Sequence, residues 1–207
     1  MFDRRKVYLN NKAVYLQWIA QDRVCFPIIK KDWEQYSRHW LSQVKKGGTV
    51  LQAGGNCGMY PFFYSNIFER TFTFEPDPMN FYCLSENCKS NKVIKMNTAL
   101  TSKPGWTTMG IVENNNVGMH KVGGGEVKIY GITIDSLNLS ELDLLHLDVE
   151  GSEFDVLNGA WKTIKRTKPV LVLEMTHEVE KMEEMILDLK YKQTAAFGDP
   201  LNKVFVP

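Results

Sequence analysis

Three glycines lie between a short apolar segment at residues 49–53 and a helix expected to begin at Met59. They are Gly54, Gly55 and Gly58, in the stretch Gly-Gly-Asn-Cys-Gly. A turn this rich in glycine lets the backbone approach a ligand closely, and the following helix N-terminus offers free N–H groups. The spacing is not the G-x-G-x-x-G of dinucleotide-binding folds. A plain strand–helix turn has the same composition, so the glycines need a second signal.

An acidic residue supplies that second signal. Glu75 ends the next expected strand, 21 residues after Gly54. A carboxylate at this place in an α/β fold can accept two hydrogen bonds from a ribose diol. The glycine turn and Glu75 together predict a nucleoside-binding site, without indicating which nucleoside. The alternative is a carboxylate that caps a helix or faces solvent.

Three polar residues alternate with apolar ones near the end of a later strand: His146, Asp148 and Glu150. The two-residue period of a strand places them on one side. Burying three polar groups in a parallel sheet is costly without partners, so they are candidate catalytic residues. The alternative is a satisfied buried network beside a helix N-terminus.

These three groups suit acid–base chemistry. A hydroxyl nucleophile needs a proton acceptor within hydrogen-bond reach, and the ordinary pKa of His146 suits that role best. Asp148 and Glu150 are the other acceptors, or they could hold a divalent cation that lowers the pKa of the hydroxyl. We predict no bound metal ion, because the chain has no His or Cys residues at metal-ligand spacing.

Charge and composition limit the class of protein. The chain has 207 residues, 43% of them hydrophobic, and a net charge of +1, which argues against a dedicated duplex-DNA binder. Residues 1–50 nevertheless carry ten Lys or Arg against four acids, whereas 135–188 are acidic. These are either two solvated faces or a basic flank that attracts an anionic substrate. We expect no membrane span or signal peptide, four reduced cysteines and a cytoplasmic location.

Strands and helices are expected to alternate along the chain. One or two strands are expected at 6–20. Strands follow at 49–53, 71–75, 93–97, 142–149, 169–174, 191–197 and 203–206. Helices are expected at 32–46, 59–69, 78–88, 153–165 and 179–189, with Asp32 and Ser152 as N-caps of the first and fourth. This alternation predicts an α/β fold with a doubly wound, mainly parallel sheet, whose ligand lies beyond the carboxyl ends of the strands.

Residues 101–134 interrupt the alternation between the third and fourth strands of the expected sheet. They are rich in Gly and Asn, with β-prone flanks at 107–112 and 126–134. We expect a β-hairpin or a long loop that covers the substrate and sets specificity.

Several motifs occur in a recognisable order: VLQAGGNCG at 50–58, FEPDP at 74–78, ITIDSL at 132–137, LDVEGSE at 147–153 and KPVLVLE at 168–174. Together they resemble the FkbM-like family of S-adenosylmethionine-dependent methyltransferases. The resemblance covers about residues 47–206 and is most specific at the D-V-E-G-x-E segment. It implies a seven-stranded Rossmann-like sheet whose last strand is antiparallel. It also implies one globular domain, with a methyltransferase unit at 47–207 and a flank of strands and a helix at 1–46.

The resemblance also implies roles for individual residues. Gly54, Asn56 and Gly58 would wrap the methionine part of the cofactor, and Glu75 would hold its ribose. Residues 97–99 would flank the adenine. The full predicted cofactor set is Gln52, Ala53, Gly54, Gly55, Asn56, Gly58, Met59, Glu75, Pro76, Asn97, Thr98, Ala99 and Asp148. The predicted catalytic set is Asp148, Glu150 and His146.

Two positions depart from the pattern of the family. The family often has Lys where this chain has His146, and Asp where it has Gln52. An Asp there can interact with the charged amino group of the cofactor, whereas Gln keeps hydrogen bonding and loses the charge.

The predicted function is S-adenosylmethionine-dependent O-methylation of a small-molecule or sugar-type hydroxyl. The alternatives are an RNA methyltransferase that uses the basic flank, and a non-catalytic binding module that keeps the fold. A nicotinamide-dependent oxidoreductase is disfavoured by the absent G-x-G-x-x-G. Because the chain leaves little room for a separate substrate domain, a homo-oligomer could complete the site.

Overall fold

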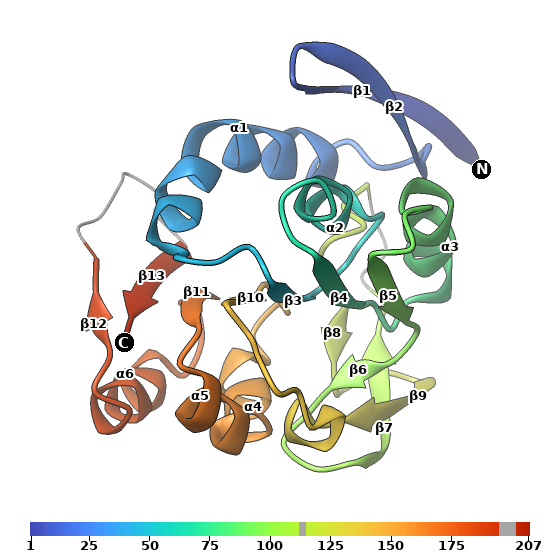
Figure 1. Ribbon diagram of the computed structural model, residues 1–207. Coiled ribbons are helices and arrows are strands. Elements are labelled where there is room, and N and C mark those ends of the chain that lie inside the picture. The colour runs from blue at the N-terminus through green and yellow to red at the C-terminus, as the bar shows by residue number, and fades with distance from the viewer. Residues whose placement is uncertain (112–114, 195–201) are drawn as a thin grey trace.

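The computed structural model describes residues 1–111, 115–194 and 202–207, and its centre is a seven-stranded sheet (Figure 1). The strand order is β12-β13-β11-β10-β3-β4-β5. In chain order the strands are β3 (Thr49–Ala53), β4 (Arg70–Phe74), β5 (Val93–Met96), β10 (Leu144–Leu147), β11 (Val170–Glu174), β12 (Lys192–Gln193) and β13 (Asn202–Val206). The pairings from β5 to β11 are parallel, whereas β13 is antiparallel to both neighbours. The sheet is therefore mixed.

Helices cover both faces of this sheet (Figure 1). One layer holds α1 (Cys25–Gln43), α2 (Met59–Tyr64) and α3 (Pro78–Asn87), and the other holds α4 (Glu153–Asn158), α5 (Trp161–Thr167) and α6 (Val179–Asp188). Leu144 and Leu145 of β10 belong to two different buried clusters, as do Val50 and Leu51 of β3. The central strands are thus apolar on both faces, as expected of parallel strands covered by helices.

The first helix begins earlier than the sequence predicted. Asp22 takes the role expected of Asp32, because its carboxylate accepts hydrogen bonds from the N–H groups of Val24, Cys25 and Phe26. A carboxylate that satisfies these otherwise unpaired donors fixes the start of the helix. Asp32 therefore lies inside α1, one of whose sides faces a cavity.

The helix expected at 153–165 is two helices, α4 and α5. The chain breaks at Gly159, where a Cβ would lie 2.2 Å from the carbonyl oxygen of Thr101. Ser152 makes no capping hydrogen bond with its side chain. Instead, Glu153 accepts hydrogen bonds from the N–H groups of Val149 and Gly151 and so shapes the turn after β10. The helix expected at 59–69 ends at Tyr64.

Residues 99–111 and 115–132 form more than the predicted hairpin. A second, four-stranded sheet has the order β6-β9-β7-β8. Its strands are β6 (Ala99–Leu100), β7 (Gly105–Gly110), β8 (Lys121–Val122) and β9 (Val127–Ile132), and a 3-10 turn at Asp135–Leu137 follows. Residue 112 of the predicted flank and residues 195–197 of the predicted strand lie outside the described residues.

An antiparallel hairpin of β1 (Phe2–Leu9) and β2 (Lys12–Ile19) begins the chain and lies over the layer of α1, α2 and α3 (Figure 1). The four cysteines are free and buried. Among the helices of the described ranges, we find none long and apolar enough to cross a membrane.

Candidate functional site

A cavity of about 270 Å³ lies beyond the carboxyl ends of β3, β4 and β10. It is at the edge of the sheet that the alternation of strands and helices predicts. Nine of the predicted site residues line it: Ala53, Gly54, Asn56, Glu75, Pro76, Thr98, Ala99, Asp148 and Glu150. The remaining ones, which the lining does not include, are Gln52, Gly55, Gly58, Met59, Asn97 and His146.

Gly54 allows the glycine turn to contact the segment after β10. Its φ is +80°, and a Cβ at this position would lie 1.7 Å from the carbonyl oxygen of Asp148. The N–H groups of Gly54 and Gly55 both donate to the carbonyl of Phe74, at 3.1 and 2.8 Å. The turn is thus packed against the ends of both β10 and β4.

Gln52 supports this turn from below. Its side-chain amide donates to the carbonyl oxygens of Ala53 and Gly54, at 3.0 and 2.8 Å. Its carbonyl oxygen accepts from the hydroxyl of Thr73 at 2.9 Å. The side chain is fully buried, so these contacts satisfy its hydrogen-bonding groups. A carboxylate could not donate to the two carbonyls, which gives the Gln at this position a structural role.

Glu75 is the carboxylate at the end of β4 that the sequence predicts as a ribose ligand. It is buried beside the cavity and accepts hydrogen bonds from the N–H groups of Asn56 at 2.6 Å and Asp77 at 2.8 Å. Burial raises its pKa to about 7, although these two hydrogen bonds and His120 oppose the shift. Its oxygens keep further lone pairs for a ligand, since each accepts a single hydrogen bond among the described residues.

Asn97 holds the segment that follows β4. Its side-chain amide donates to the carbonyl oxygens of Glu75 and Pro76, at 2.8 and 3.1 Å. It therefore holds the Glu75–Pro76 segment at the cavity without lining it, while its neighbours Thr98 and Ala99 do line it.

Asp148 and Glu150 lie on the turn after β10, within the same cavity wall. Burial raises the pKa of the Asp148 carboxyl well above its usual range, and the nearby Glu174 and Glu150 add to the shift. The pKa of Glu150 is also raised by burial, against the opposing charges of Lys121 and His120. Glu150 has a φ of +54°, and Gly151 follows it at +97°, so a tight turn presents the two carboxyl groups. A carboxyl with a raised pKa is a suitable proton acceptor near neutrality.

His146 does not join the two acids at the cavity. It is fully buried, and its Nδ1 lies 2.8 Å from the hydroxyl of Tyr64. The rings of Trp40 and Tyr60 pack around it, with centroids at 5.6 and 4.7 Å. Burial lowers its pKa to about 3, so the imidazole is neutral. Asp148 follows the last residue of β10, so the two-residue alternation that would place all three side chains together ends before it.

Sequence reasoning did not assign four titratable residues to the site that line the cavity: Cys25, Asp32, His120 and Glu174. Among them, His120 contacts the residue that caps α3. Its Nδ1 lies 3.3 Å from the carboxylate of Asp77, which raises the pKa of His120 and lowers that of Asp77. Asp77 also caps α3 by accepting from the N–H groups of Met79 and Asn80. No sequence signal links a histidine in the Asn- and Gly-rich insertion to this cap, because the contact depends on tertiary packing.

Residues 116–120 of the insertion, which include His120, form one wall of the cavity. The carbonyl oxygen of Val117 accepts hydrogen bonds from the side-chain amides of Asn56 and Asn80, at 3.3 and 2.9 Å. The backbone N–H of Arg23 donates to the carbonyl of Asn115 at 2.7 Å. The insertion thus covers the cavity and is fastened to the glycine turn and to α3. Cys25, Ile28, Ile29 and Asp32 of α1 line it as well, so the N-terminal flank takes part in the site.

Metal-binding geometry is not found in the part of the chain that the structure describes. No group of three or more His, Cys, Asp or Glu side chains there is placed to share a metal ion.

An α/β sheet with a buried carboxylate, a glycine turn and two further acids at the carboxyl ends of its strands is the arrangement that the sequence motifs predict. The profile of the methyltransferase FkbM domain matches residues 56–193, and the chain belongs to this family. None of the curated proteins compared with the chain matches it.

Solved structures agree on the fold. Methyltransferase FkbM from Methylobacillus flagellatus KT is 16% identical with a TM-score of 0.58, over 82% of this chain and 46% of that one. A fibrillarin pre-rRNA processing protein from Methanococcus jannaschii is 12% identical with a TM-score of 0.51, over 99% and 81%. A ribosomal protein L11 methylase from Lactobacillus delbrueckii subsp. bulgaricus is 8% identical with a TM-score of 0.51, over 86% and 78%. These structural similarities indicate a methyltransferase-like α/β fold, and identities this low leave the substrate open.

Proposed function

We propose that this protein transfers a methyl group from S-adenosylmethionine to a hydroxyl of a small-molecule or sugar-type acceptor. The observation that carries the proposal is the buried Glu75 carboxylate, which faces the cavity beside the glycine turn. Membership in the methyltransferase FkbM domain family supports the reaction class. We interpret the strand order, with β13 antiparallel beside β11, as a seven-stranded Rossmann-like sheet.

The residues at the cavity fit this cofactor. Glu75 has acceptor capacity for a ribose diol, and Pro76, Thr98 and Ala99 form a wall on the adjacent side, suited to a purine ring. Asn56 and Gly54 also line the cavity, and Gly54 lies against Asp148, where the methionine end would lie. The cavity volume of about 270 Å³ is close to the lower end of the range of about 300–1,000 Å³ that encloses small ligands.

When bound, the cofactor supplies a methyl group on a sulfonium, so the protein has mainly to align a nucleophile with it. Glu75 would orient the ribose by accepting hydrogen bonds from its two hydroxyl groups. The carboxyl of Asp148 or Glu150 accepts the proton that the acceptor hydroxyl loses, and their raised pKa values favour keeping it. Val117 and Val122 line the cavity from the insertion and reduce the access of water to the reacting groups.

Thermal unfolding with S-adenosylhomocysteine, with NADH as the control ligand for a dinucleotide site, tests the cofactor. A ligand at about 100 times its Kd adds roughly 2.7 kcal/mol, which raises the Tm of a domain of this size by several degrees. We expect a rise with S-adenosylhomocysteine alone. Glu75→Gln should reduce it, while Glu184→Gln, an exposed change on α6, should leave it intact.

No rise with either ligand at millimolar concentration would contradict the proposal and favour a binding module that keeps the fold. A rise with NADH alone would instead favour a nicotinamide enzyme.

A further inference from the structure

The outward face of the β1–β2 hairpin combines cations and aromatic rings. The register pairs Lys6 with Tyr15, Arg4 with Gln17 and Tyr8 with Ala13 across the two strands. Side chains directly opposite each other lie on the same face of a sheet. Arg4, Lys6, Tyr8 and Tyr15 are therefore on one face, and all four are exposed, Tyr8 by 52% and Tyr15 by 58%.

The other face of the hairpin fixes this surface to the body of the protein. Val7, Leu16 and Trp18 are buried in one hydrophobic cluster with residues of α1 and α2. The backbone N–H and carbonyl of Gln17 exchange hydrogen bonds with the side chain of Asn87 of α3, at 2.6 and 2.7 Å. The exposed cations and rings thus stand on a ribbon that is ordered before any partner binds, which lowers the entropy cost of binding.

This face carries cationic side chains and no acidic ones. The strand residues that share it include no acid: Phe2, Arg4, Lys6, Tyr8, Ala13, Tyr15, Gln17 and Ile19. The Lys6 ammonium lies 5.0 Å from the ring centroid of Tyr8. Phe2 packs against Tyr82 of α3, with centroids 4.9 Å apart, so the row of rings continues onto the neighbouring helix. These side chains are absent from the lining of the cavity, so the surface is separate from the candidate site.

We propose that this face binds single-stranded nucleic acid. Cations at alternate strand positions can pair with successive phosphates, and exposed tyrosines between them can stack on unpaired bases. A duplex hides its bases from such rings. Binding to an anionic membrane surface needs larger apolar side chains that insert into the lipid, and this face exposes only two tyrosines beside its cations. The near-neutral net charge of the whole chain does not oppose the proposal, because the basic excess is concentrated in residues 1–50.

The test is fluorescence anisotropy of the full chain with a labelled oligouridine of about eight nucleotides, within the usual site size of roughly 4–16. We expect saturable binding that weakens as salt is raised. Tyr8→Ser with Tyr15→Ser should weaken it by at least about fivefold for each stacked base lost. Arg4→Gln with Lys6→Gln should make the logarithmic salt dependence shallower by about 1.4, the value for two phosphate contacts of a single strand.

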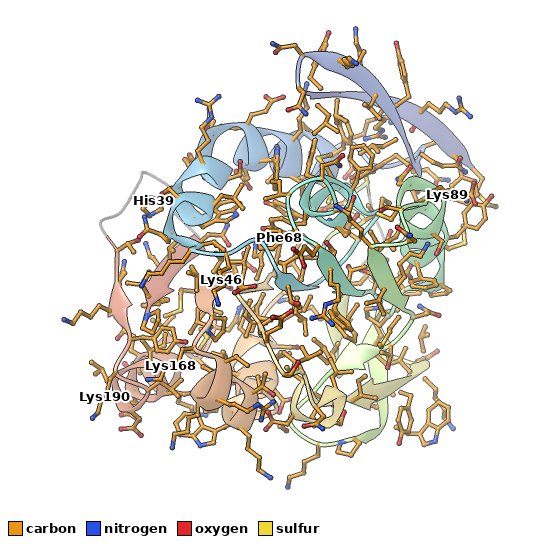
Figure 2. The ribbon with its side chains drawn as sticks, viewed as in Figure 1. His39, Lys46, Phe68, Lys89, Lys168 and Lys190 are labelled. Carbon is orange, nitrogen blue, oxygen red and sulfur yellow. The ribbon has the colours of Figure 1, made fainter. Side chains whose placement is uncertain are left out.

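The matched control removes two cations at the far end of the protein, where Figure 2 labels Lys168 and Lys190 near α5 and α6. Both are exposed with φ of +53° and +63°, so Lys168→Asn with Lys190→Asn removes charge while keeping a residue that tolerates this backbone. We expect this control to bind as the unaltered chain does. Thermal unfolding should show that every variant is folded.

Three results would overturn the proposal. The first is no binding up to about 100 μM protein at low salt, the weak end of non-specific nucleic-acid affinity. The second is that the tyrosine variant binds oligouridine as tightly as the unaltered chain does. The third is that the unaltered chain binds a heparin oligosaccharide or phosphatidylserine vesicles, which carry negative charge but no bases, as tightly as oligouridine or more tightly.

Discussion

The ionisation of Glu75 should make nucleoside binding depend on pH. Its pKa is raised to about 7 by burial. The hydroxyl groups of a ribose diol make stronger hydrogen bonds to an ionised carboxylate than to a protonated carboxyl group. One unit below the pKa about a tenth of the carboxyl groups is ionised, and one unit above it about nine tenths. Affinity should therefore rise about tenfold between about pH 6 and pH 8, equivalent to about 1.4 kcal/mol.

The probe for this assay is 5′-methylthioadenosine, measured by isothermal titration calorimetry. It keeps the adenine, the ribose diol and the sulfur but has no ammonium or carboxylate of its own. Glu75→Gln should bind more weakly and without the pH dependence. The 2′,3′-dideoxy form of the probe should lose the pH dependence in the unaltered protein, because its donors are absent.

Neighbouring charges define a second control. His120 lies close enough to lower the pKa of Glu75, and Asp77 acts in the opposite direction. His120→Gln should therefore keep the pH dependence but move its midpoint to higher pH. A dependence that survives in Glu75→Gln, or that vanishes in His120→Gln, would refute the assignment of the titration to Glu75.

Three further outcomes are expected. Gly54→Ala should lower the free energy of unfolding, measured by urea denaturation, by more than about 2 kcal/mol. The reason is that a Cβ would overlap the Asp148 carbonyl and that the φ is positive. A loss below about 1 kcal/mol, roughly the cost of the positive φ alone, would contradict the contact. Tyr64→Phe should cost about 1–2 kcal/mol by leaving Nδ1 of His146 unpaired, with unchanged affinity for S-adenosylhomocysteine; lost affinity would place His146 in the site. Asp148→Asn and Glu150→Gln should separate affinity from turnover, and the one that lowers turnover about 10²–10⁴-fold is the proton acceptor; normal turnover in both would refute the role.

Local patterns predicted the sheet well. The strand at 49–53 matches β3 at both ends, and the helix expected at 78–88 differs from α3 by one residue. Both have strong local signals, an apolar run before glycines in the first case and an Asp-Pro start in the second. These elements also carry Gly54 and Glu75 to the cavity, which is why most of the predicted cofactor residues meet there.

Tertiary contacts decided what the sequence could not predict. The start of α1 depends on the Asp22 carboxylate, which Trp18 and Arg5 of the hairpin also contact, so its capping role was hidden in a distant pairing. His120 reaches the cavity because Val117 bonds to two asparagines far away in the chain. The two-residue alternation of a strand predicted His146 on the same side as Asp148. That alternation applies only within the strand, and β10 ends at Leu147, before Asp148.

The contact between Gly54 and Asp148 constrains the two positions unequally. Position 54 meets a carbonyl oxygen, which every residue at position 148 would supply, so the contact does not depend on the side chain there. A saturation library should therefore lose almost every substitution at 54 when selected for folded protein alone. At 148, the same selection should retain many substitutions, and only selection for turnover should remove them. We therefore expect substitutions to be limited by backbone geometry at position 54 and by chemistry at position 148.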